Sequence, residues 1–326
     1  MNFDALYSSF EAELKEVEHA ILDLFRSNTS LIPAIGNYII RGGGKRIRPL
    51  FLLASTELFG YGGKDRIMLA GIIEAIHTAS LIHDDVVDSA QMRRGQPAAH
   101  SVWNNQIVIL VGDFLYSNAL RVAVLHKNQM IMEHLSHATT SMTEGELLQL
   151  SRISDPEISE EEYLKIIAGK TGALISAACS IGAIVSGAGP EQIQALADFG
   201  MKTGMAFQMV DDILDYAAEE DGLGKKLGKD LEEGKITLPV IELYAAADKS
   251  ERNELKEIIC SDGNEEAEDG LKRIFDLFRK YDTINISMKK AAKLINDAKD
   301  RLDSIEQSLN KDMLKILADY ALERDK

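Results

Sequence analysis

Hydrophobic residues recur at steps of three and four at both ends of the chain, which is the period of an α-helix. The two runs are Phe3, Leu6, Phe10, Leu14, Val17, Ile21 and Leu24, and Leu302, Ile305, Leu309, Met313, Ile316 and Tyr320. Sustained alternation of hydrophobic and polar residues, the pattern of a strand, does not occur in the sequence. The pattern therefore predicts an all-α protein, a bundle of roughly ten or more helices of ordinary length.

Local signals place some of the helix ends. Ser159 followed by Glu162 forms a capping box before a hydrophobic run, and Pro190 suits the first turn of a helix. Residues 41–49, 89–97 and 217–235 combine glycine with charge, and we expect loops there. Because none of these segments resembles a linker, we expect a single domain over residues 1–326.

Residues 171–190 carry no charge and are long enough to cross a bilayer. Most of them are small, so a tightly packed buried helix is the better prediction, and we expect no transmembrane segment. The acidic residues Asp4, Glu11 and Glu13 also argue against a targeting peptide. Cys179 and Cys260 lie far apart, in no metal-ligand or disulfide pattern, which fits the cytoplasm.

The charge balance restricts the partners. The chain has 36 Lys and Arg residues against 52 Asp and Glu residues, a net charge of −16. Binding to nucleic acid is not expected, because a phosphate backbone needs a basic surface. An anionic substrate must therefore be held by local clusters of basic residues.

A short acidic pattern occurs twice, as Asp84-Asp85-Val86-Val87-Asp88 and as Asp211-Asp212-Ile213-Leu214-Asp215. On a helix, the first and last aspartates of each pattern share one face. Such carboxylates repel unless a cation neutralises them, and oxygen ligands without cysteine favour Mg²⁺. One copy is equally typical of a solvated surface. A second copy, and the polar stripes that lead to the patterns through His77, Ser80 and Gln208, favour a functional site.

Basic residues gather near glycines, where backbone amides and cationic side chains can approach an anion together. The clusters are Arg41, Lys45, Arg46 and Arg48 beside Gly42, Gly43 and Gly44; Arg93 and Arg94 before Gly95; Lys225, Lys226, Lys229 and Lys235; and Lys170 with Thr171. Together with the acidic patterns, they indicate metal-assisted departure of a phosphate-type leaving group in an apolar cavity.

In these motifs the chain resembles the trans-polyprenyl diphosphate synthases. The resemblance covers about residues 42–239, in family order: Gly-Gly-Gly-Lys-Arg-Ile-Arg-Pro at 42–49, His77, the first aspartate motif with Arg93-Arg94-Gly95, Lys170-Thr171, Gln208, the second aspartate motif and Lys225. It implies an all-α orthogonal bundle of the isoprenoid synthase type around a central cavity, and a homodimer.

The resemblance also implies residue roles. The metal ligands would be Asp84, Asp85, Asp88, Asp211, Asp212 and Asp215, of which Asp84, Asp88, Asp211 and Asp212, with Lys170, would be catalytic. The allylic diphosphate would be bound by Arg93, Lys170, Thr171, Gln208, Lys225 and Lys235, and isopentenyl diphosphate by Lys45, Arg48, His77 and Arg94. The reaction that the resemblance implies is ionisation of the allylic substrate, attack by the isopentenyl double bond and loss of a proton.

Product length is argued from the residues just before the first motif. Ala79 and Ser80 are small, whereas short-product relatives tend to carry an aromatic plug there. The first motif also lacks the two extra residues of bacterial farnesyl synthases. We therefore expect a medium or long product, octaprenyl diphosphate being favoured, as a precursor of a quinone side chain.

Three alternatives remain at this point. A short-chain farnesyl or geranylgeranyl synthase would share the chemistry. A non-catalytic subunit of a heteromeric prenyl synthase would share the fold. A metal phosphohydrolase of the HD type is suggested by His83 beside Asp84, with His77, but it leaves the second aspartate motif unexplained.

Overall fold

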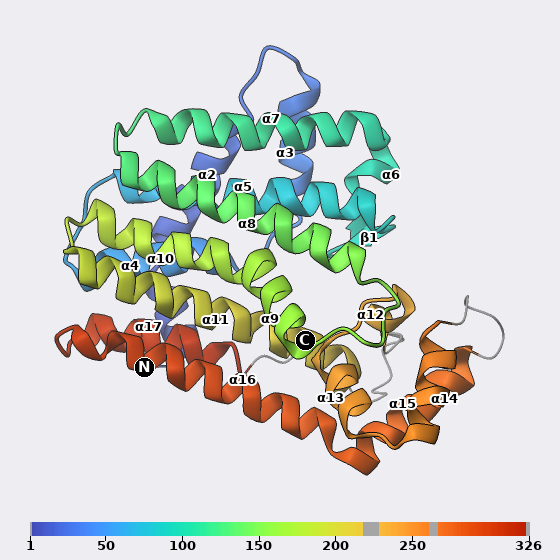
Figure 1. Cartoon of the computed structure of the whole chain (residues 1–326). Coiled ribbons are helices and arrows are strands. Elements are labelled where there is room, and N and C mark those ends of the chain that lie inside the picture. Colours follow the sequence, from blue (N-terminus) through green and yellow to red (C-terminus); the bar gives the residue numbers. More distant parts are fainter. Residues whose placement is uncertain (1, 218–227, 261–266, 324–326) are drawn as a thin grey trace. The chain divides into compact units, whose positions relative to one another are not determined.

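The computed structural model describes residues 2–217, 228–260 and 267–323, and these are overwhelmingly helical (Figure 1). The all-α prediction is confirmed, apart from one two-stranded hairpin. The chain forms two compact units, each assembled from separate segments. Unit 1 comprises Met1–Thr139, Leu174–Gly200 and Arg301–Leu317; unit 2 comprises Thr140–Ala173, Met201–Asp300 and Ala318–Lys326. The single domain over the whole chain stays a prediction.

The elements fall into three groups. Within unit 1 they are α1 (Phe3–Ser9), α2 (Glu11–Leu24), α3 (Leu31–Arg41), α4 (Ile47–Leu58), α5 (Asp65–Val87), β1 (Met92–Arg93), β2 (Gln96–Pro97), α6 (Ala99–Trp103) and α7 (Asn105–Val124). Within unit 2 they are α9 (Glu160–Ile167), the π-helical turn η1 (Ala168–Gly172), α12 (Lys229–Glu232), α13 (Leu238–Ala246), α14 (Lys249–Ile259), α15 (Ala267–Tyr281) and α16 (Thr283–Lys299). Both units share α8 (Gln129–Ser151), α10 (Ala173–Val185), α11 (Pro190–Ala217), η2 (Asp300–Ser304) and α17 (Leu309–Tyr320).

Helix α5 is the centre of unit 1 and packs against α2, α4 and α7 (Figure 1). Its side chains from Leu69 to Ile76 are buried, because a helix that is apolar on most of its circumference belongs inside a protein. The helix ends at Val87 with Asp88 as its C-cap. The first aspartate motif therefore lies at the C-terminal end of a rigid, buried helix.

The core of unit 2 surrounds the second aspartate motif. Apolar side chains of α9, α11, α13, α15 and α16 form one buried cluster, which includes Met209, Val210 and Ile213 of α11. Tyr163 of α9 is in the same cluster and is 2% exposed. The carboxylates of this motif are thus attached to a helix whose other faces are packed against the unit.

The local predictions have mixed outcomes. The capping box of Ser159 and Glu162 is confirmed, and α11 does begin at Pro190. The N-terminal hydrophobic run is two helices, since α1 ends and α2 begins around Phe10. The expected loop at 41–49 is shorter, because α4 already begins at Ile47. The expected loop at 89–97 contains the hairpin of β1 and β2.

Three helical stretches are long and apolar enough, by length and composition alone, to cross a membrane: Asp65–Val87, Asn105–Val124 and Glu160–Val185. The first and third are mostly buried inside the structure. The uncharged stretch from residue 171 belongs to the third and is a buried helix, as predicted, although the helix ends at Val185. Only one third of the α7 stretch is buried.

Candidate functional site: two aspartate motifs and their basic partners

The glycine-rich loop between α3 and α4 owes its shape to left-handed backbone conformations. Gly43 and Gly44 have φ values of +70° and +145°, which glycine adopts without a steric penalty. Arg46 is also left-handed, with φ of +48°. Lys45, between these residues, is exposed, whereas Arg46 is 4% exposed and points into the protein. The loop therefore presents one cation and buries the next.

The hairpin after α5 carries a second pair of basic residues to this loop. Arg94 and Gly95 form its two-residue turn with φ of +50° and +77°, the backbone of a type I′ turn. The Arg94 guanidinium donates a hydrogen bond to the carbonyl oxygen of Gly43. A Cβ atom on Gly44 would lie 2.7 Å from a guanidinium nitrogen of Arg94. Glycine at position 44 thus lets the predicted isopentenyl-binding residues Lys45 and Arg94 come together.

His77 of α5 is held in its neutral form. Burial, with the nearby cationic groups of Arg48 and Arg94, lowers the pKa of His77 well below its ordinary value. The guanidinium groups of Arg93 and Arg46 act in the same direction. The structure therefore brings the predicted group of His77, Arg48 and Arg94 together in unit 1, as an electropositive site with a neutral imidazole.

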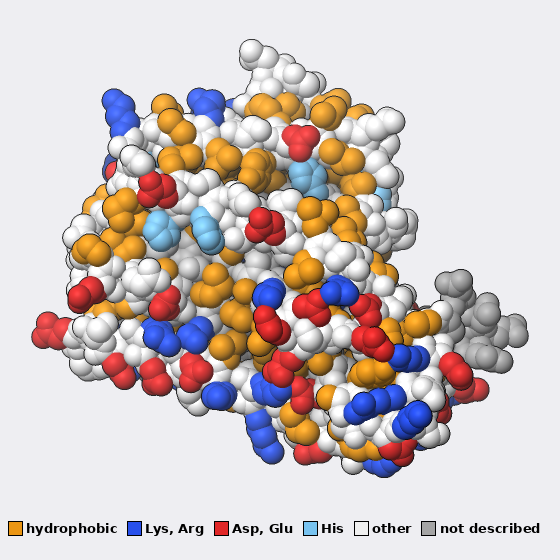
Figure 2. Space-filling view, in the orientation of Figure 1, with side chains coloured by type: hydrophobic (Ala, Val, Ile, Leu, Met, Phe, Trp, Pro, Cys, Tyr) orange, Lys and Arg blue, Asp and Glu red, His pale blue; other side chains and the backbone are white. Residues whose placement is uncertain are grey.

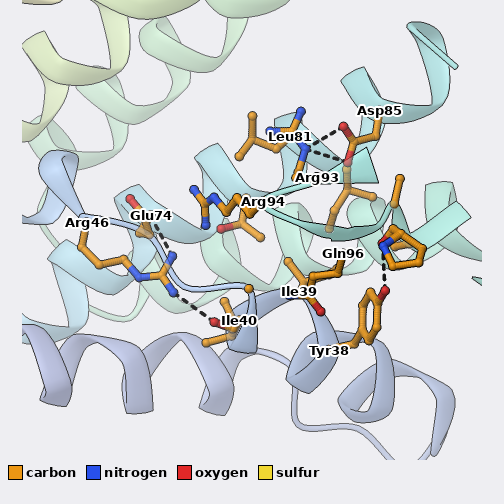
Figure 3. Close-up of a pocket in the computed structure, with 16 residues that line it drawn as sticks. Tyr38, Ile39, Ile40, Arg46, Glu74, Leu81, Asp85, Arg93, Arg94 and Gln96 are labelled. Carbon is orange, nitrogen blue, oxygen red and sulfur yellow. Dashed lines mark hydrogen bonds and ion pairs between the residues drawn. The ribbon is translucent and has the colours of Figure 1, made fainter. Parts of the chain in front are cut away.

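The first aspartate motif has two kinds of carboxylate. The backbone N–H of Asp88 donates to the carbonyl oxygen of Asp84 at 2.8 Å, so the helical repeat places these two side chains on one face. Asp85 is 6% exposed, and its two oxygens lie 2.6 and 2.8 Å from Nε of Arg93 (Figure 3). Two predicted ligand residues, Asp85 and Arg93, are thus paired with each other, whereas Asp84 and Asp88 are half-buried.

A cavity in unit 1 lies beside this motif, between α3, α5 and the hairpin (Figure 3). Its walls include Ile39, Leu81 and Arg94. At one end Arg46 donates to Glu74 of α5 and to the carbonyl oxygen of Ile40. Sequence analysis assigned no role to this ion pair.

The residues that we expect to set product length differ in exposure. Ala79 is 1% exposed, so its methyl group is part of the core of unit 1. Ser80 is half-buried, and its hydroxyl donates to the carbonyl oxygen of His77 at 2.8 Å. Their role in chain length stays a prediction.

His83 does not extend toward His77. Its Nε2 lies 3.2 Å from the carbonyl oxygen of Ile109 and 3.4 Å from Oδ1 of Asp113, both on α7. The hypothesis of an HD phosphohydrolase needs this imidazole as a metal ligand beside Asp84. The contact with α7 therefore argues against it.

In unit 2, Lys170 and Thr171 lie on a π-helical turn, a rare distortion that is frequent at functional sites. Nζ of Lys170 is 2.8 Å from Oε2 of Glu146 and 2.8 Å from Oε1 of Gln149, both on α8. A Cβ on Gly145 would lie 2.9 Å from the backbone nitrogen of Lys170, so glycine is needed for this close approach.

The second aspartate motif repeats the division seen in the first. Asp211 is exposed and Asp215 is half-buried, but Asp212 is 6% exposed. Oδ2 of Asp212 accepts from Tyr163 at 2.7 Å, and Oδ1 accepts from Gln208 at 2.8 Å. Burial and the nearby Asp230 carboxylate raise the pKa of Asp212.

A further carboxylate, Asp230, lies close to this motif. Its backbone N–H donates to Oδ2 of Asp215 at 2.9 Å. Burial and repulsion from Asp215 raise the pKa of Asp230, and the Lys235 ammonium opposes that rise. Nζ of Lys235 is also 2.8 Å from Oε2 of Glu233. Lys225, a predicted ligand of the allylic diphosphate, lies outside the described residues.

The donor chemistry of both motifs suits Mg²⁺, which prefers carboxylate oxygens and often keeps water or substrate phosphate as further ligands. Among the residues that the structure describes, no three His, Cys, Asp or Glu side chains are grouped closely enough to hold a metal by themselves.

Sequence analysis missed partners that lie far away along the chain. They are Glu74, Glu146, Gln149, Tyr163 and Asp230. A signal existed for Glu74, an isolated acid in an apolar run, and for the polar pair at positions 146 and 149. Tyr163 gave no signal, since an aromatic residue in an amphipathic helix is typical of a core.

The chain matches the polyprenyl synthetase family over residues 29–278. It is 36% identical over 325 residues to the octaprenyl diphosphate synthase of Haemophilus influenzae, covering 100% of this chain and 98% of that protein. It is 42% identical over 241 residues to the octaprenyl diphosphate synthase of Escherichia coli, covering 74% and 75%. A short chain isoprenyl diphosphate synthase of Methanothermobacter thermautotrophicus is 38% identical, covering 88% and 89%.

The fold is also similar to that of solved polyprenyl synthase structures. A polyprenyl synthase from Caulobacter crescentus, complexed with calcium and isoprenyl diphosphate, has a TM-score of 0.90 and 37% identity, covering 98% of this chain and 97% of that one. The chain therefore belongs to the polyprenyl synthetase family. It is an enzyme, a prenyltransferase of the trans-polyprenyl diphosphate synthase class.

Proposed function

We propose that the protein condenses isopentenyl diphosphate head-to-tail with an allylic diphosphate and releases a medium or long trans-polyprenyl diphosphate. The observation that carries this proposal is the pairing, within each unit, of an aspartate motif on a buried helix with basic groups. In unit 1 these are the groups around His77; in unit 2 the ammonium group of Lys170 accompanies the motif on α11. Two acidic motifs with separate basic groups suit a reaction of two diphosphates.

Isopentenyl diphosphate is assigned to unit 1. Lys45 is exposed beside the glycine-rich loop, and Arg94 is fixed against that loop by its hydrogen bond to Gly43. Because the depressed pKa keeps His77 neutral at pH 7, it binds a phosphate oxygen by donating one hydrogen bond, without adding charge. Arg48 completes the group.

For the allylic diphosphate we propose the residues that the resemblance implies, Arg93, Lys170, Thr171, Gln208 and Lys235, together with Lys225, which lies outside the described residues. Arg93 is paired with Asp85, and Lys170 with Glu146. Each cation therefore starts with a carboxylate partner, and binding of the diphosphate exchanges one anion for another.

Mg²⁺ is the proposed cofactor. Asp84, Asp88, Asp211 and Asp215 offer accessible or half-buried carboxylates to it, and the prediction for Asp85 and Asp212 stands beside them. When bound, Mg²⁺ neutralises the negative charge that builds up on the departing diphosphate. The Caulobacter crescentus polyprenyl synthase, complexed with calcium and isoprenyl diphosphate, supports the use of a divalent cation.

The reaction begins with heterolysis of the allylic carbon–oxygen bond, whose electron pair leaves with the diphosphate. Basic side chains of the allylic group, Lys170 among them, stabilise that charge. The isopentenyl double bond then attacks the allylic cation, and a proton is lost to the departing diphosphate. Apolar surroundings protect the cation from water.

The proposed product is octaprenyl diphosphate, a precursor of a quinone side chain. The small residues Ala79 and Ser80 support a long product, and so do the octaprenyl relatives. The similarity to a short chain synthase keeps farnesyl or geranylgeranyl diphosphate as the alternative.

We also propose that the enzyme is a homodimer and works in the cytoplasm. Hydrophobic side chains gather on the surface over α7 (Figure 2), where Ile109 and Leu110 are 38% and 66% exposed. An apolar helix face of this kind suits burial against a second copy. Sedimentation analysis of the wild type and of Leu110→Glu tests this, since the charge should convert a dimer into monomers.

The deciding experiment incubates the purified chain with labelled isopentenyl diphosphate, an allylic starter and Mg²⁺, and separates the dephosphorylated products. A ladder ending near eight isoprene units is expected. Products that stop at three or four units would support the short-chain alternative. No elongation would favour a non-catalytic subunit that acts with a partner.

A further inference from the structure

We propose that Tyr163 is a positioning residue that acts through Asp212 to orient Gln208 and Thr171 in the allylic diphosphate site. The inference rests on the proposed function, because it assigns Gln208 and Thr171 to that site. Its basis is a chain of three hydrogen bonds that joins α9, α11 and η1 within unit 2.

In this series of hydrogen bonds, each donor and each acceptor is defined. The Thr171 hydroxyl donates to Oε1 of Gln208 at 2.7 Å, and Nε2 of Gln208 donates to Oδ1 of Asp212 at 2.8 Å. The Tyr163 hydroxyl donates to Oδ2 of the same carboxylate at 2.7 Å. Both ends of the chain thus donate toward Asp212.

In its ionised form the Asp212 carboxylate fixes this direction, because it then only accepts hydrogen bonds. Since Asp212 accepts from the Gln208 amide nitrogen, the amide oxygen must face Thr171. The Thr171 proton is therefore committed to Gln208, and the lone pairs of its hydroxyl oxygen remain for another donor. Without Asp212, nothing would hold the Gln208 side-chain amide in this orientation. Turned by 180°, it would donate from its nitrogen to the Thr171 hydroxyl, which would then be the acceptor.

Burial helps to hold the Asp212 carboxylate in one orientation. Tyr163 is 2% exposed, Thr171 is 4% exposed and Asp212 is 6% exposed, so water competes little for these bonds. Gln208 is half-buried and stands between the anchored carboxylate and the hydroxyl. Hydrogen-bond networks that are buried and satisfied hold their members in one arrangement.

A close approach of the α11 and η1 backbones allows the hydrogen bond between Thr171 and Gln208 to form. A Cβ on Gly204 of α11 would lie 2.7 Å from Cα of Gly172 and 3.1 Å from the carbonyl oxygen of Thr171. The absence of a side chain at Gly204 lets η1 approach α11 closely. The short Thr171 side chain then reaches Gln208, one turn beyond Gly204.

The two aspartates at the start of the motif therefore have different tasks. Asp211 is exposed to solvent, whereas both oxygens of Asp212 are buried and accept from protein donors. In this proposal Asp212 is the anchor of a substrate-binding pair, and Tyr163 holds the anchor from the core.

The test compares Tyr163→Phe with Tyr281→Phe. Both substitutions delete one hydroxyl that donates to a carboxylate in unit 2, since Tyr281 donates to Oε2 of Glu251 at 2.5 Å. We expect Tyr163→Phe to lower kcat at least tenfold and to raise KM for the allylic substrate. KM for isopentenyl diphosphate should stay within twofold of wild type. The matched Tyr281→Phe should leave all three values within twofold.

A second measurement does not depend on turnover. Both variants are titrated calorimetrically with a non-ionising allylic thiolodiphosphate in the presence of Mg²⁺. Tyr163→Phe should bind it at least tenfold more weakly than Tyr281→Phe does. If the wild type binds this ligand but does not elongate the ordinary allylic diphosphate, the proposed function fails while the comparison still decides on Tyr163.

A double substitution separates positioning from a general effect on folding. Once Gln208→Leu has broken the chain, adding Tyr163→Phe should lower kcat by less than twofold further. Equal behaviour of the two single tyrosine variants, or full additivity in the double variant, would overturn the proposal.

Discussion

The buried ion pair between Arg46 and Glu74 gives a prediction whose size follows from the structure. Nη1 of Arg46 lies 3.2 Å from Oε1 of Glu74, and the two side chains are 3% and 4% exposed. Nε of Arg46 also lies 3.1 Å from Oε1 of Glu18, whose side chain is 40% exposed. Exposed pairs contribute about 0–1 kcal/mol, so the contact with Glu18 is the weaker one.

The perturbation is Arg46→Met, which keeps an unbranched apolar stem, shorter than that of arginine, and removes the charge. Glu74 then remains buried without its cation, and breaking a buried pair in this way costs about 3–5 kcal/mol. With an unfolding entropy of about 2.1 cal/mol/K per residue, this lowers the melting temperature of a 326-residue chain by about 4–7 °C.

The control is the double variant Arg46→Met with Glu74→Leu. It removes both charges, and apolar replacements of a buried pair are often neutral or stabilising. We expect it to regain at least half of the lost melting temperature in a calorimetric scan, so the two substitutions are not additive. KM for isopentenyl diphosphate should be raised in both the single and the double variant, because the ion pair that holds Arg46, the neighbour of Lys45, against α5 is lost in each.

The reasoning would be refuted by a loss of less than 1 °C in Arg46→Met, or by a double variant that melts at the temperature expected from simple addition. Either result would mean that water or other groups already stabilise the buried negative charge of Glu74. If KM for isopentenyl diphosphate returned to the wild-type value in the double variant, the ion pair would not be needed for binding of that substrate.

Three further predictions concern other parts of the chain. Gly204→Ala should destabilise the protein by about 1–3 kcal/mol and lower kcat, because its Cβ would lie 2.7 Å from a backbone carbon of η1. Gly62→Ala, which meets nothing within 4 Å, is the control in the same unfolding and rate measurements. Hydrogen bonding from Lys280 lowers the pKa of Glu251 from 4.5 to about 2, so its stabilising contribution is complete above pH 4.5 and is lost as pH falls toward 2. The difference in melting temperature between wild type and Glu251→Gln should shrink over that range; a constant difference would contradict the assignment. Ala79→Tyr should shorten the product, as seen by chromatography of dephosphorylated chains, and an unchanged distribution would refute the role of this position.

The parts of the fold that could be predicted are those determined by neighbouring residues. The capping box at Ser159 and the helix start at Pro190 depend on side chains within one turn, and the structure confirms both. The hairpin could not be found by hydrophobic alternation, since each strand has only two residues. Its signal was Arg94-Gly95, a turn that needs two positive φ values.

Much of the candidate site depends on contacts that no local pattern encodes. Arg46 and Glu74 are 28 residues apart, and Tyr163 and Asp212 are 49 apart. The residue types at the site could be predicted from the chemistry of a diphosphate. The partner of each residue could not, because it is set by which helices pack together.

Helix geometry explains why the same five-residue motif yields two kinds of aspartate in both units. Successive residues are turned by about 100° on a helix, so the second aspartate faces away from the shared stripe of the first and last. That direction leads into the packed side, where a charge needs a partner. Unit 1 supplies a cation to Asp85, namely Arg93, whereas unit 2 supplies the neutral donors Tyr163 and Gln208 to Asp212. The first and last aspartates are thus the ones we propose as metal ligands on the shared face, and in unit 2 the second is the one we propose as an anchor for the groups around it.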